Sequence, residues 1–361
     1  MDLAEVRNVL IRGPNWLGDL VMATAGLRAL RVACPRARIT LWVRAGLEPL
    51  LAGSPDVDQI RGLPVYASRM SFLRNLGRAA ESVRSEAPYD LGICLPDSLS
   101  SALLMRRANA RPLVGYTNAS RRFFLDHPVP VAEVGPEGRK APREDRVLAL
   151  MTRLGVAPRG THPSLWTTPG EEEELLRVLS RLGKDGSNAP WVGLAPGAAY
   201  GSSKRWPVDR FAALGDALAR DGAEIFILGA PHEASICTEV AQSMHAPASN
   251  LCGQLSLGAF KALIRRCGLV VSNDSGARHV AVAFDVPTLA FFGPTDVSRT
   301  RNNLEGVTIL EGEADCRPCY QRECPTDHRC LLGITVDEVT VRARARLKSG
   351  QTSRVGPEIR L

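Results

Sequence analysis

The feature that most constrains this chain is a repeated alternation of short apolar runs with longer segments of helical character. Residues 9–12, 38–43 and 91–95 are such runs. Each is followed by a segment with helical spacing, at residues 19–34, 46–52 and 98–107 respectively. Apolar runs of this length, bounded by turn residues, predict buried strands. Strands that alternate with helices form parallel sheets through right-handed crossovers, so we expect a doubly wound α/β fold.

The alternation occurs twice, which predicts two domains. The second series comprises residues 191–195, 224–228, 269–272 and 287–292. The first of these runs is followed by a helical segment over residues 207–221, with Pro207 suited to its first turn. A length of 361 residues also suggests two domains at about 150 residues each. Residues 157–190 are rich in Pro and Gly, so we place the connection there and expect domains 1–165 and 166–361, the second ending in a C-terminal helix. Ligands of Rossmann-like domains bind at the carboxyl ends of the strands, so we expect two such domains facing a central cleft.

Composition excludes several classes of protein. Hydrophobic residues make up 45% and charged residues 23% of the chain, which is typical of a globular protein and not of a disordered or coiled-coil chain. No apolar run approaches the ~20 residues that cross a bilayer. Residues 1–8 contain two acidic residues and no apolar stretch, so we expect no signal peptide and a cytoplasmic protein.

Charge is unevenly distributed along the chain. Residues 1–165 contain 23 Lys and Arg against 15 Asp and Glu, whereas residues 166–361 contain 22 against 23. A basic half indicates an anionic partner such as nucleic acid, an anionic membrane or a phosphorylated substrate. The alternative is free use of arginine, which supplies 40 of the 45 basic residues. Aromatic residues make up only 5% and form no stacking cluster, which argues against nucleic acid.

The first loop, residues 13–19, has the sequence Gly-Pro-Asn-Trp-Leu-Gly-Asp. It lies where a dinucleotide-binding fingerprint would lie but lacks the G-x-G-x-x-G spacing, which argues against a nicotinamide cofactor. We expect Asp19 at a helix start that follows the carboxyl end of a strand. Position alone favours a helix cap over a catalytic carboxylate.

Two further loops close strands in the second half. Residues 195–207 contain small residues followed by Lys204, and residues 272–279 read Ser-Asn-Asp-Ser-Gly-Ala-Arg-His. Amides at a helix start, here those of Ser275 and Gly276, can form a cradle for a pyrophosphate together with a cation.

Both loops also allow plainer interpretations. Asp274 could cap the helix that follows, His279 could be a core histidine, and the first loop could be a solvated turn. Two cradles at strand ends in one half nevertheless favour a nucleotide-diphosphate site over two unrelated loops.

In their order and spacing these segments resemble the bacterial heptosyltransferases of glycosyltransferase family 9. The resemblance runs along most of the chain and rests on the early Gly-Asp, P-G-A…S-K-R-W-P, L-G-A-P-H-E, N-L-C-G-Q-L-S-L and S-N-D-S-G-A-R-H, of which the last is highly specific. It implies a glycosyltransferase of the GT-B type with two Rossmann-like domains. It also implies that the N-terminal domain binds the acceptor and that the C-terminal domain binds ADP-heptose.

Site residues follow from the resemblance. It implies that Asp19 is the general base, that Lys204 contacts the donor phosphates, that Glu233 is the ribose ligand and that Leu255 contacts adenine. The implied contacts to the pyrophosphate and heptose are Asp274, Ser275, Gly276 and His279. Inverting transfer needs a base for the acceptor hydroxyl and positive charge or amides for the departing diphosphate, so we expect no cofactor to be required for catalysis.

A rival motif is Asp56-Val-Asp58, a D-x-D sequence, which is the metal-binding pattern of the other main glycosyltransferase fold. It lies in Ser-Pro-Asp-Val-Asp before an apparent strand and away from the nucleotide loops. We therefore interpret it as a turn.

The second specific feature is a cysteine-rich segment, residues 316–330. Four of the nine cysteines lie in it: Cys316, Cys319, Cys324 and Cys330. The C-x-x-C start favours a structural zinc ion held by thiolates, with an iron–sulfur cluster or free thiols as alternatives. Within the family, such a segment is similar to that of the members that add the second heptose.

The acceptor implied by the family is an anionic lipid A-linked core oligosaccharide at the cytoplasmic face of the inner membrane. It agrees with the basic N-terminal half and implies peripheral inner-membrane contact and no nucleic acid. We expect acceptor contacts from Arg121 and Arg122, with Phe123 and Phe124 as a membrane or acyl contact. The other basic candidates are Arg106, Arg107, Arg111, Arg139, Lys140 and Arg143.

The resemblance, together with these observations, implies inverting transfer of L-glycero-D-manno-heptose from ADP-heptose to the first heptose of the lipopolysaccharide inner core (heptosyl-Kdo-lipid A). One alternative is transfer of the first or a later core heptose. Alternatives from other classes are a nucleotide-dependent oxidoreductase or epimerase and a non-catalytic sugar- or RNA-binding protein.

Overall fold

The computed structural model describes residues 2–64, 71, 74–75, 77, 80, 88–118, 120–131, 137–184 and 189–353. The chain divides into two compact units. The first comprises Met1–Trp166 with Ser298–Asn302, and the second comprises Thr167–Val297 with Asn303–Leu361. A short segment from the second half of the sequence therefore belongs to the first unit.

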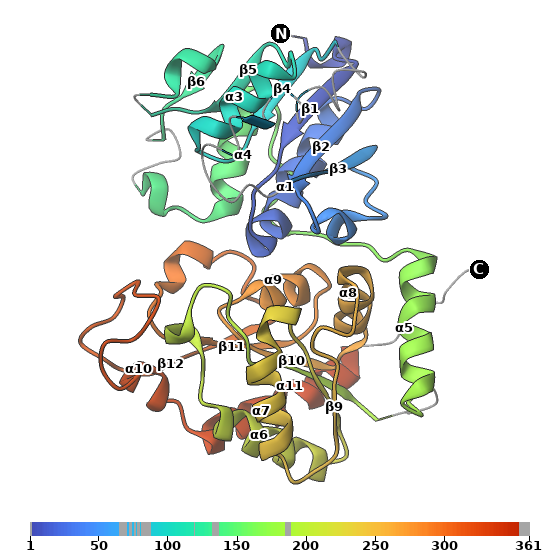
Figure 1. The fold of residues 1–361 in the computed structure, drawn as a ribbon, viewed down its shortest axis with the longest axis vertical. Helices are drawn as coiled ribbons and strands as arrows, with labels where there is room; N and C mark the ends of the chain where they lie inside the picture. Colours follow the sequence, from blue (N-terminus) through green and yellow to red (C-terminus); the bar gives the residue numbers. More distant parts are fainter. Residues whose placement is uncertain are drawn as a thin grey trace. The chain divides into compact units, whose positions relative to one another are not determined.

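The described residues of the first unit form a six-stranded sheet with the order β3-β2-β1-β4-β5-β6, and every neighbouring pair is parallel (Figure 1). Its strands are β1 (Asn8–Arg12), β2 (Arg38–Arg44), β3 (Gln59–Leu63), β4 (Leu91–Cys94), β5 (Leu113–Tyr116) and β6 (His127–Val129). The expected α/β class is confirmed for this half of the chain.

Helices cover this sheet. They include α1 (Leu17–Ala33), which packs against α4 (Arg143–Arg153), and α3 (Leu99–Arg107), which packs on β4 and β5. The helix expected at residues 46–52 is instead one 3₁₀ turn, η2 (Glu48–Leu51), with Pro49 in its first turn. Gly53, whose φ of 81° is left-handed, and Pro55 follow directly and end the element after one turn.

The second unit repeats the architecture, with the strand order β12-β11-β10-β7-β8-β9, again parallel throughout. Its strands are β7 (Trp191–Ala195), β8 (Glu224–Ile227), β9 (Ala248–Asn250), β10 (Leu269–Asn273), β11 (Thr288–Phe292) and β12 (Val307–Glu311). Its helices include α5 (Pro169–Arg181), α6 (Val208–Arg220), α7 (Ala234–Ser243), α8 (Leu257–Arg266), α9 (Gly276–Ala283), α10 (Arg329–Leu332) and α11 (Val336–Ser353).

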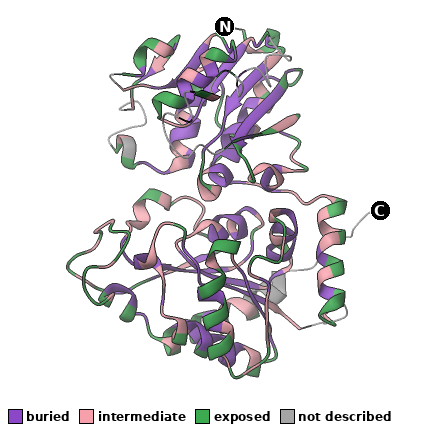
Figure 2. Cartoon of the chain, in the orientation of Figure 1, coloured by how far each residue is buried: buried purple, intermediate pink, exposed green. Residues whose placement is uncertain are grey.

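The central strands of both sheets are buried along most of their length (Figure 2). Helices on both faces exclude water from a parallel sheet, which explains why these strands are continuous apolar runs and do not alternate with polar residues. α6 begins at Val208, so Pro207 is its N-cap residue and does not lie in the first turn as expected. No helix in the described part of the chain is both long and apolar enough to cross a membrane.

In each sheet the strand order reverses between two adjacent central strands, β1 and β4 in the first unit and β7 and β10 in the second. The loops that follow these strands must diverge, because the next helices lie on opposite faces of the sheet. In open α/β sheets this point creates the crevice in which ligands bind. The topology therefore gives each unit a candidate ligand site at this point.

Candidate active site

In the second unit, the loop after β7 is fixed to the end of β10 by Asn273. The Nδ2 atom of Asn273 donates to the carbonyl oxygens of Pro196 at 2.7 Å and Gly197 at 3.2 Å. Its Oδ1 atom accepts from the backbone N–H of Trp206 at 2.9 Å. Asn273 has no exposed surface. The sequence motifs assign no role to Asn273, although a polar residue at the end of an apolar strand is a usable signal.

Lys204 and Asp274 form a buried ion pair at this switch point. The Nζ atom of Lys204 lies 2.5 Å from Oδ2 of Asp274 and 3.2 Å from its carbonyl oxygen. The Thr295 hydroxyl donates to the same carboxylate at 2.9 Å, and the Arg278 guanidinium lies 3.7 Å from Oδ1. Ser275, and not Asp274, occupies the N-cap position of α9, so the cap interpretation of Asp274 is wrong.

The charge of this cluster is favourable for an anion. Burial alone would raise the pKa of Asp274, but Lys204 and Arg278 outweigh it and hold the pKa below its ordinary value. Asp274 is therefore ionised at neutral pH, and the two cations leave the cluster with a net positive charge.

His279 lies buried beside Arg278, with Nε2 at 3.1 Å from a guanidinium nitrogen. Burial, reinforced by the Arg278 charge, lowers the pKa of His279 well below its ordinary value, so the imidazole is neutral. A guanidinium can only donate hydrogen bonds, so Nε2 accepts and Nδ1 carries the proton. The structure therefore gives His279 a polar partner within this cluster.

The N-terminus of α9 supplies amides next to the cluster. Ser275 and Gly276 are both half-buried at the helix start. The first N–H groups of a helix have no acceptor within the helix, and the helix dipole adds partial positive charge there. This arrangement suits a phosphate or diphosphate group.

Glu233 ends η7 (Pro231–Glu233), which follows β8 on the other side of β7. Its Oε2 atom accepts from the backbone N–H of Ala230 at 2.9 Å. A Cβ atom on Gly197 would lie 2.1 Å from Oε1, so only glycine allows the loop after β7 to approach Glu233 this closely. The structure thus brings Glu233 to the same loop, while Leu255 lies half-buried in the turn before α8.

Tyr200 and Lys204 have the Tyr-x-x-x-Lys spacing of an oxidoreductase acid–base pair. However, the Tyr200 hydroxyl donates to the carbonyl oxygen of Tyr320 at 2.6 Å, and Lys204 is bonded to Asp274. The Lys204 ammonium faces the Tyr200 ring, 4.9 Å from its centroid, and not the hydroxyl. The geometry does not support an oxidoreductase.

In the first unit, Asp19 is the third residue of α1 and makes no capping hydrogen bond. Its Oδ2 atom lies 3.0 Å from a guanidinium nitrogen of Arg143 on α4, and both side chains are 24% exposed. Arg143, which the charge pattern assigned to the acceptor surface, thus orients this carboxylate. Among the described residues, Oδ1 of Asp19 has no hydrogen-bond partner.

A second ion pair lies at the β1/β4 switch point. Asp97, in the loop after β4, lies 2.5 Å from the guanidinium of Arg146 on α4. Arg12, at the end of β1, fixes the loop before Asp19 by donating to the Gly13 carbonyl and the Asn15 side chain. Burial lowers the pKa of Arg12 to about 10, which still leaves the guanidinium charged at neutral pH. No motif in the sequence indicates this network.

Arg121 is fully buried, which overturns its expected contact with an acceptor. Its Nη1 atom donates to the Pro96 carbonyl oxygen at 2.6 Å, and its Nη2 atom would lie 2.8 Å from a Cβ on Gly115. The guanidinium packs against β4 and β5 and has no surface that an acceptor could touch.

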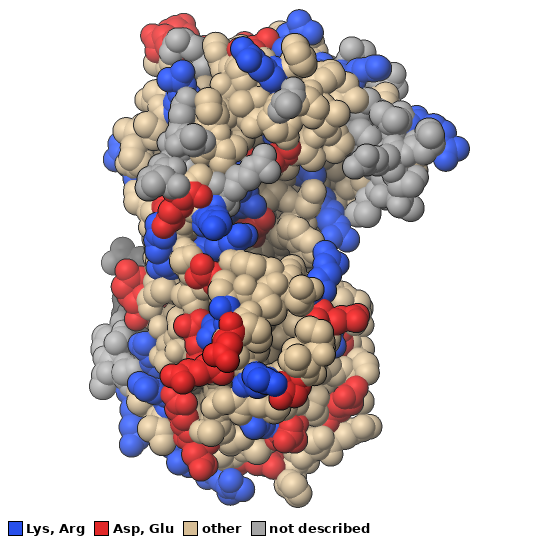
Figure 3. Space-filling view, turned by 90° about the vertical axis from the view of Figure 1, so that its left-hand side faces the viewer, with Lys and Arg blue, Asp and Glu red and all other residues tan. Residues whose placement is uncertain are grey.

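The other basic candidates divide by environment. Arg106 makes two hydrogen bonds of 2.9 Å to Asp126. Four candidates are exposed: Arg107, Arg111, Arg122 and Lys140. The side chain of Arg139 lies outside the described residues. Phe123, beside Arg122, is 83% exposed, whereas Phe124 is half-buried. On the face in Figure 3, most visible acidic side chains lie on the second unit, as the sequence asymmetry indicates.

The cysteine-rich segment contains the four thiols that the sequence suggests as zinc ligands. Among the described residues, no group of three or more His, Cys, Asp or Glu side chains is arranged to hold a metal ion. Cys316 is exposed, whereas Cys330 is buried in the core beside Leu331. Cys324 hydrogen-bonds Thr326, and this bond lowers the pKa of the thiol.

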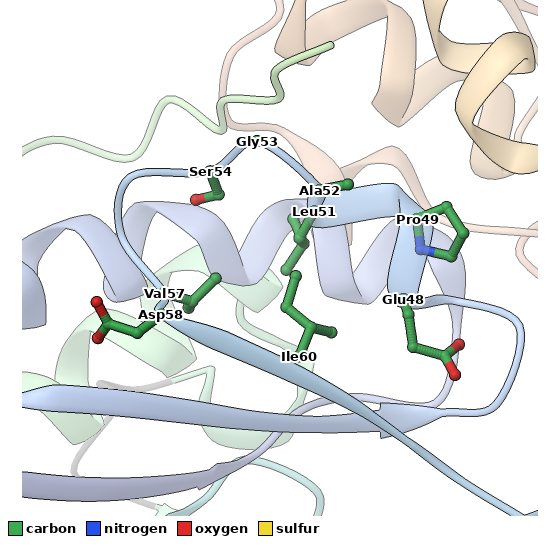
Figure 4. Close-up of a pocket in the computed structure, with 9 residues that line it drawn as sticks. All are labelled: Glu48, Pro49, Leu51, Ala52, Gly53, Ser54, Val57, Asp58 and Ile60. Carbon is green, nitrogen blue, oxygen red and sulfur yellow. The ribbon is translucent and has the colours of Figure 1, made fainter. Parts of the chain in front are cut away.

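The D-x-D sequence is a turn, as expected. Asp56 is buried, whereas Asp58 accepts from the N–H of Ile39 at 2.7 Å and pairs with Arg31 at 2.5 Å. An open cavity of about 570 Å³ adjoins this turn, with the Asp58 carboxylate at one end and that of Glu48 at the other (Figure 4). The two aspartates do not form a metal-binding pair.

The model of glycosyltransferase family 9 (heptosyltransferase) matches residues 76–329, which is more than half of the chain. The chain belongs to this family. Among its relatives, lipopolysaccharide heptosyltransferase 2 of Escherichia coli K12 is 31% identical over 356 residues, covering 94% of this chain and 98% of that protein.

Solved structures agree with this assignment. The structure of E. coli ADP-heptose lps heptosyltransferase II superimposes with a TM-score of 0.79 and 25% identity, covering 95% of this chain and 99% of that one. A family 9 glycosyltransferase from Veillonella parvula gives a TM-score of 0.84 at 21% identity, covering 97% and 99%, which shows the shared fold. The expected GT-B-type fold of this family 9 glycosyltransferase is therefore confirmed.

Proposed function

We propose that this family 9 enzyme transfers L-glycero-D-manno-heptose from ADP-heptose to the first heptose of the lipopolysaccharide inner core, with inversion at the transferred carbon. The observation that carries the proposal is the nearly full-length similarity to a protein named lipopolysaccharide heptosyltransferase 2. The switch-point clusters of both units have the chemistry that this reaction needs.

The second unit is the proposed donor-binding domain. A sugar-linked diphosphate carries negative charge that increases as the glycosidic bond breaks, so its site must supply positive charge or amide dipoles. The N-terminus of α9 at Ser275 and Gly276 and the cluster of Lys204, Asp274 and Arg278 supply both. We assign the ribose to Glu233, which adjoins the same loop, and the adenine to Leu255. His279, as a neutral donor through Nδ1, is assigned to the diphosphate and heptose.

The first unit is the proposed acceptor-binding domain, with Asp19 as the base. The Asp19 carboxylate accepts the proton of the acceptor hydroxyl, whose oxygen then forms the bond to the heptose anomeric carbon. The bond between that carbon and the diphosphate oxygen breaks, and ADP leaves with the electron pair. Arg143 holds Oδ2 of Asp19 at 3.0 Å, which leaves Oδ1 for the acceptor.

The acceptor's lipid portion requires contact with the inner membrane, which we place on the first unit. Arg122 and Phe123 are adjacent and exposed, and Phe123 is 83% exposed. A basic and an aromatic side chain together suit the interface of an anionic membrane. This surface would place a cytoplasmic, peripheral enzyme on the inner membrane.

The proposed reaction needs no metal or other cofactor, because protein groups supply both the base and the charge stabilisation. Chelation with EDTA should therefore leave turnover unchanged. The direct test of function is to incubate the protein with ADP-heptose and lipid A acceptors that carry zero, one or two heptoses. We expect ADP release and a product of one added heptose only with the one-heptose acceptor. Equal or faster transfer to either other acceptor would contradict the assigned position.

The role of Asp19 has its own test. Asp19→Asn should reduce turnover about 10²-fold or more, because the hydroxyl loses its proton acceptor. ADP binding and the melting temperature should change little. Asp58→Asn is the matched control, since Asp58 is also paired with an arginine in the first unit, and its turnover should stay near wild type. Turnover of Asp19→Asn within a few-fold of wild type would show that Asp19 is not the base.

A further inference from the structure

Part of the cysteine-rich segment makes contacts through its backbone carbonyl groups and not through its thiols. Residues 320–322, between Cys319 and Cys324, lie against the loop that carries Lys204. The two segments are about 120 residues apart in the sequence. We propose that residues 320–322, which we term the brace, position the donor-binding loop. This inference rests on the proposed use of ADP-heptose.

Three successive carbonyl groups of the brace accept hydrogen bonds from the loop. The Tyr200 hydroxyl donates to the Tyr320 carbonyl oxygen at 2.6 Å, and the Ser203 hydroxyl donates to that of Gln321 at 2.6 Å. The Ser203 N–H donates to the Arg322 carbonyl oxygen at 3.1 Å. Ser203 directly precedes Lys204, so these bonds fix the backbone from which the Lys204 side chain extends.

The backbones of the two segments touch at Gly201. A Cβ atom on Gly201 would lie 2.1 Å from the Arg322 carbonyl oxygen and 2.9 Å from the Arg322 Cα atom. These are backbone atoms, which cannot rotate away as a side chain can. Any larger residue at Gly201 must therefore push the loop and the brace apart.

The Tyr200 ring joins the brace to Lys204. Its centroid lies 4.9 Å from the Lys204 ammonium and 5.6 Å from the Arg322 guanidinium carbon. Cation–π attraction on this ring complements the hydrogen bonds of its hydroxyl. Lys204 is thus restrained both by Tyr200 and by its bond to Asp274.

The brace is itself anchored to the sheet. The Tyr320 N–H donates to the Pro294 carbonyl oxygen at 2.9 Å, just beyond β11. The Arg317 guanidinium donates to the carbonyl oxygens of Gly293 at 2.7 Å and Gly312 at 2.9 Å. The backbone of this segment, which has few apolar side chains, is therefore held in a defined position. Its carbonyl groups in turn hold the loop that carries Lys204.

These contacts make Tyr200, Gly201 and Ser203 positioning residues, which act through Lys204. Their loss should weaken donor binding more than it changes the rate with saturating donor. Loss of one hydrogen bond in Tyr200→Phe, which retains the ring, should raise the Kd for ADP and the KM for ADP-heptose about three- to tenfold. Gly201→Ala should raise both by tenfold or more.

The experiment measures ADP binding by calorimetry, together with kcat, both KM values and the melting temperature, for wild type and each variant. Gly170→Ala is the matched control, because an added Cβ there meets nothing within 4 Å. We expect a higher Kd for ADP in Gly201→Ala and Tyr200→Phe, an unchanged acceptor KM, and wild-type values in Gly170→Ala. A purely structural role would lower the melting temperature and leave the Kd of the folded protein unchanged.

The outcomes separate this inference from the proposed function. Wild-type protein that does not bind ADP would overturn both. If wild type binds ADP and both variants bind it within twofold of wild type, only the brace is refuted. If Gly201→Ala does not fold, the Tyr200→Phe Kd decides.

Discussion

Replacing Asp274 by asparagine should destabilise the second unit strongly, because the carboxylate balances two buried cations. The Lys204 ammonium lies 2.5 Å from Oδ2 and the Arg278 guanidinium 3.7 Å from Oδ1. The exposed fractions of these side chains are only 11% for Lys204 and 2% for Arg278. Asparagine keeps the shape but removes the charge, so both cations remain in a poorly solvated site. Breaking a buried pair from one side costs about 3–5 kcal/mol, and we expect a loss in this range.

Urea denaturation at pH 7 measures this loss as the change in the free energy of unfolding. Asp221→Asn is the matched control, because Asp221 also pairs with an arginine in the second unit but is largely exposed. The free energy of unfolding should fall far less in Asp221→Asn than in Asp274→Asn, because solvent screens the charges of an exposed pair. Adding Lys204→Met to Asp274→Asn should recover part of the lost stability, because one uncompensated charge is then absent. A loss below about 1 kcal/mol in Asp274→Asn would refute the reasoning.

The same carboxylate predicts a pH dependence. The pKa of Asp274 in the folded state lies below its ordinary value, so the unfolded chain binds its proton more readily. Its contribution to stability is therefore complete above the unfolded pKa of about 4 and is lost as the pH falls through the folded pKa. The unfolding free energy of wild type should fall more steeply below pH 4 than that of Asp274→Asn. Parallel curves would contradict this assignment.

Two other predictions concern packing and a local turn. Gly26→Ala should lower the free energy of unfolding by about 1–3 kcal/mol, because the added Cβ atom would lie 2.3 Å from a Val147 methyl group. The double variant Gly26→Ala with Val147→Ala removes this clash and should restore the melting temperature. The Asp216 carboxylate accepts hydrogen bonds from the N–H groups of His245, at 2.9 Å, and Ala246, at 2.8 Å. Burial alone would raise the pKa of Asp216, but these bonds outweigh burial and hold the pKa below its ordinary value. Asp216→Asn should therefore lower stability at neutral pH but differ less from wild type below pH 4, as measured by urea denaturation across that range.

The sequence by itself determined the class of fold and indicated which loops lie at the candidate donor site. Apolar runs such as residues 191–195 and 269–272 match β7 and β10 closely, because a strand covered on both faces must be apolar throughout. The loops after these runs contain Lys204 and Asp274, and parallel topology places both loops at the same edge of the sheet. Two local expectations were wrong. Residues 48–51 form one 3₁₀ turn, η2, and not an α-helix, and Pro207 is the N-cap residue of α6 and does not lie in its first turn.

Only the tertiary structure decided what each charged side chain contacts. Arg121 and Arg122 are adjacent in a basic sequence, yet one is fully buried and the other exposed. Asp19 is joined to Arg143 across 124 residues, so no local pattern could indicate the pair. The brace likewise contacts the Lys204 loop through its backbone carbonyls, which every sequence possesses. Such contacts depend on which strands become neighbours in the sheet, and that order is fixed by long-range packing and not by local sequence.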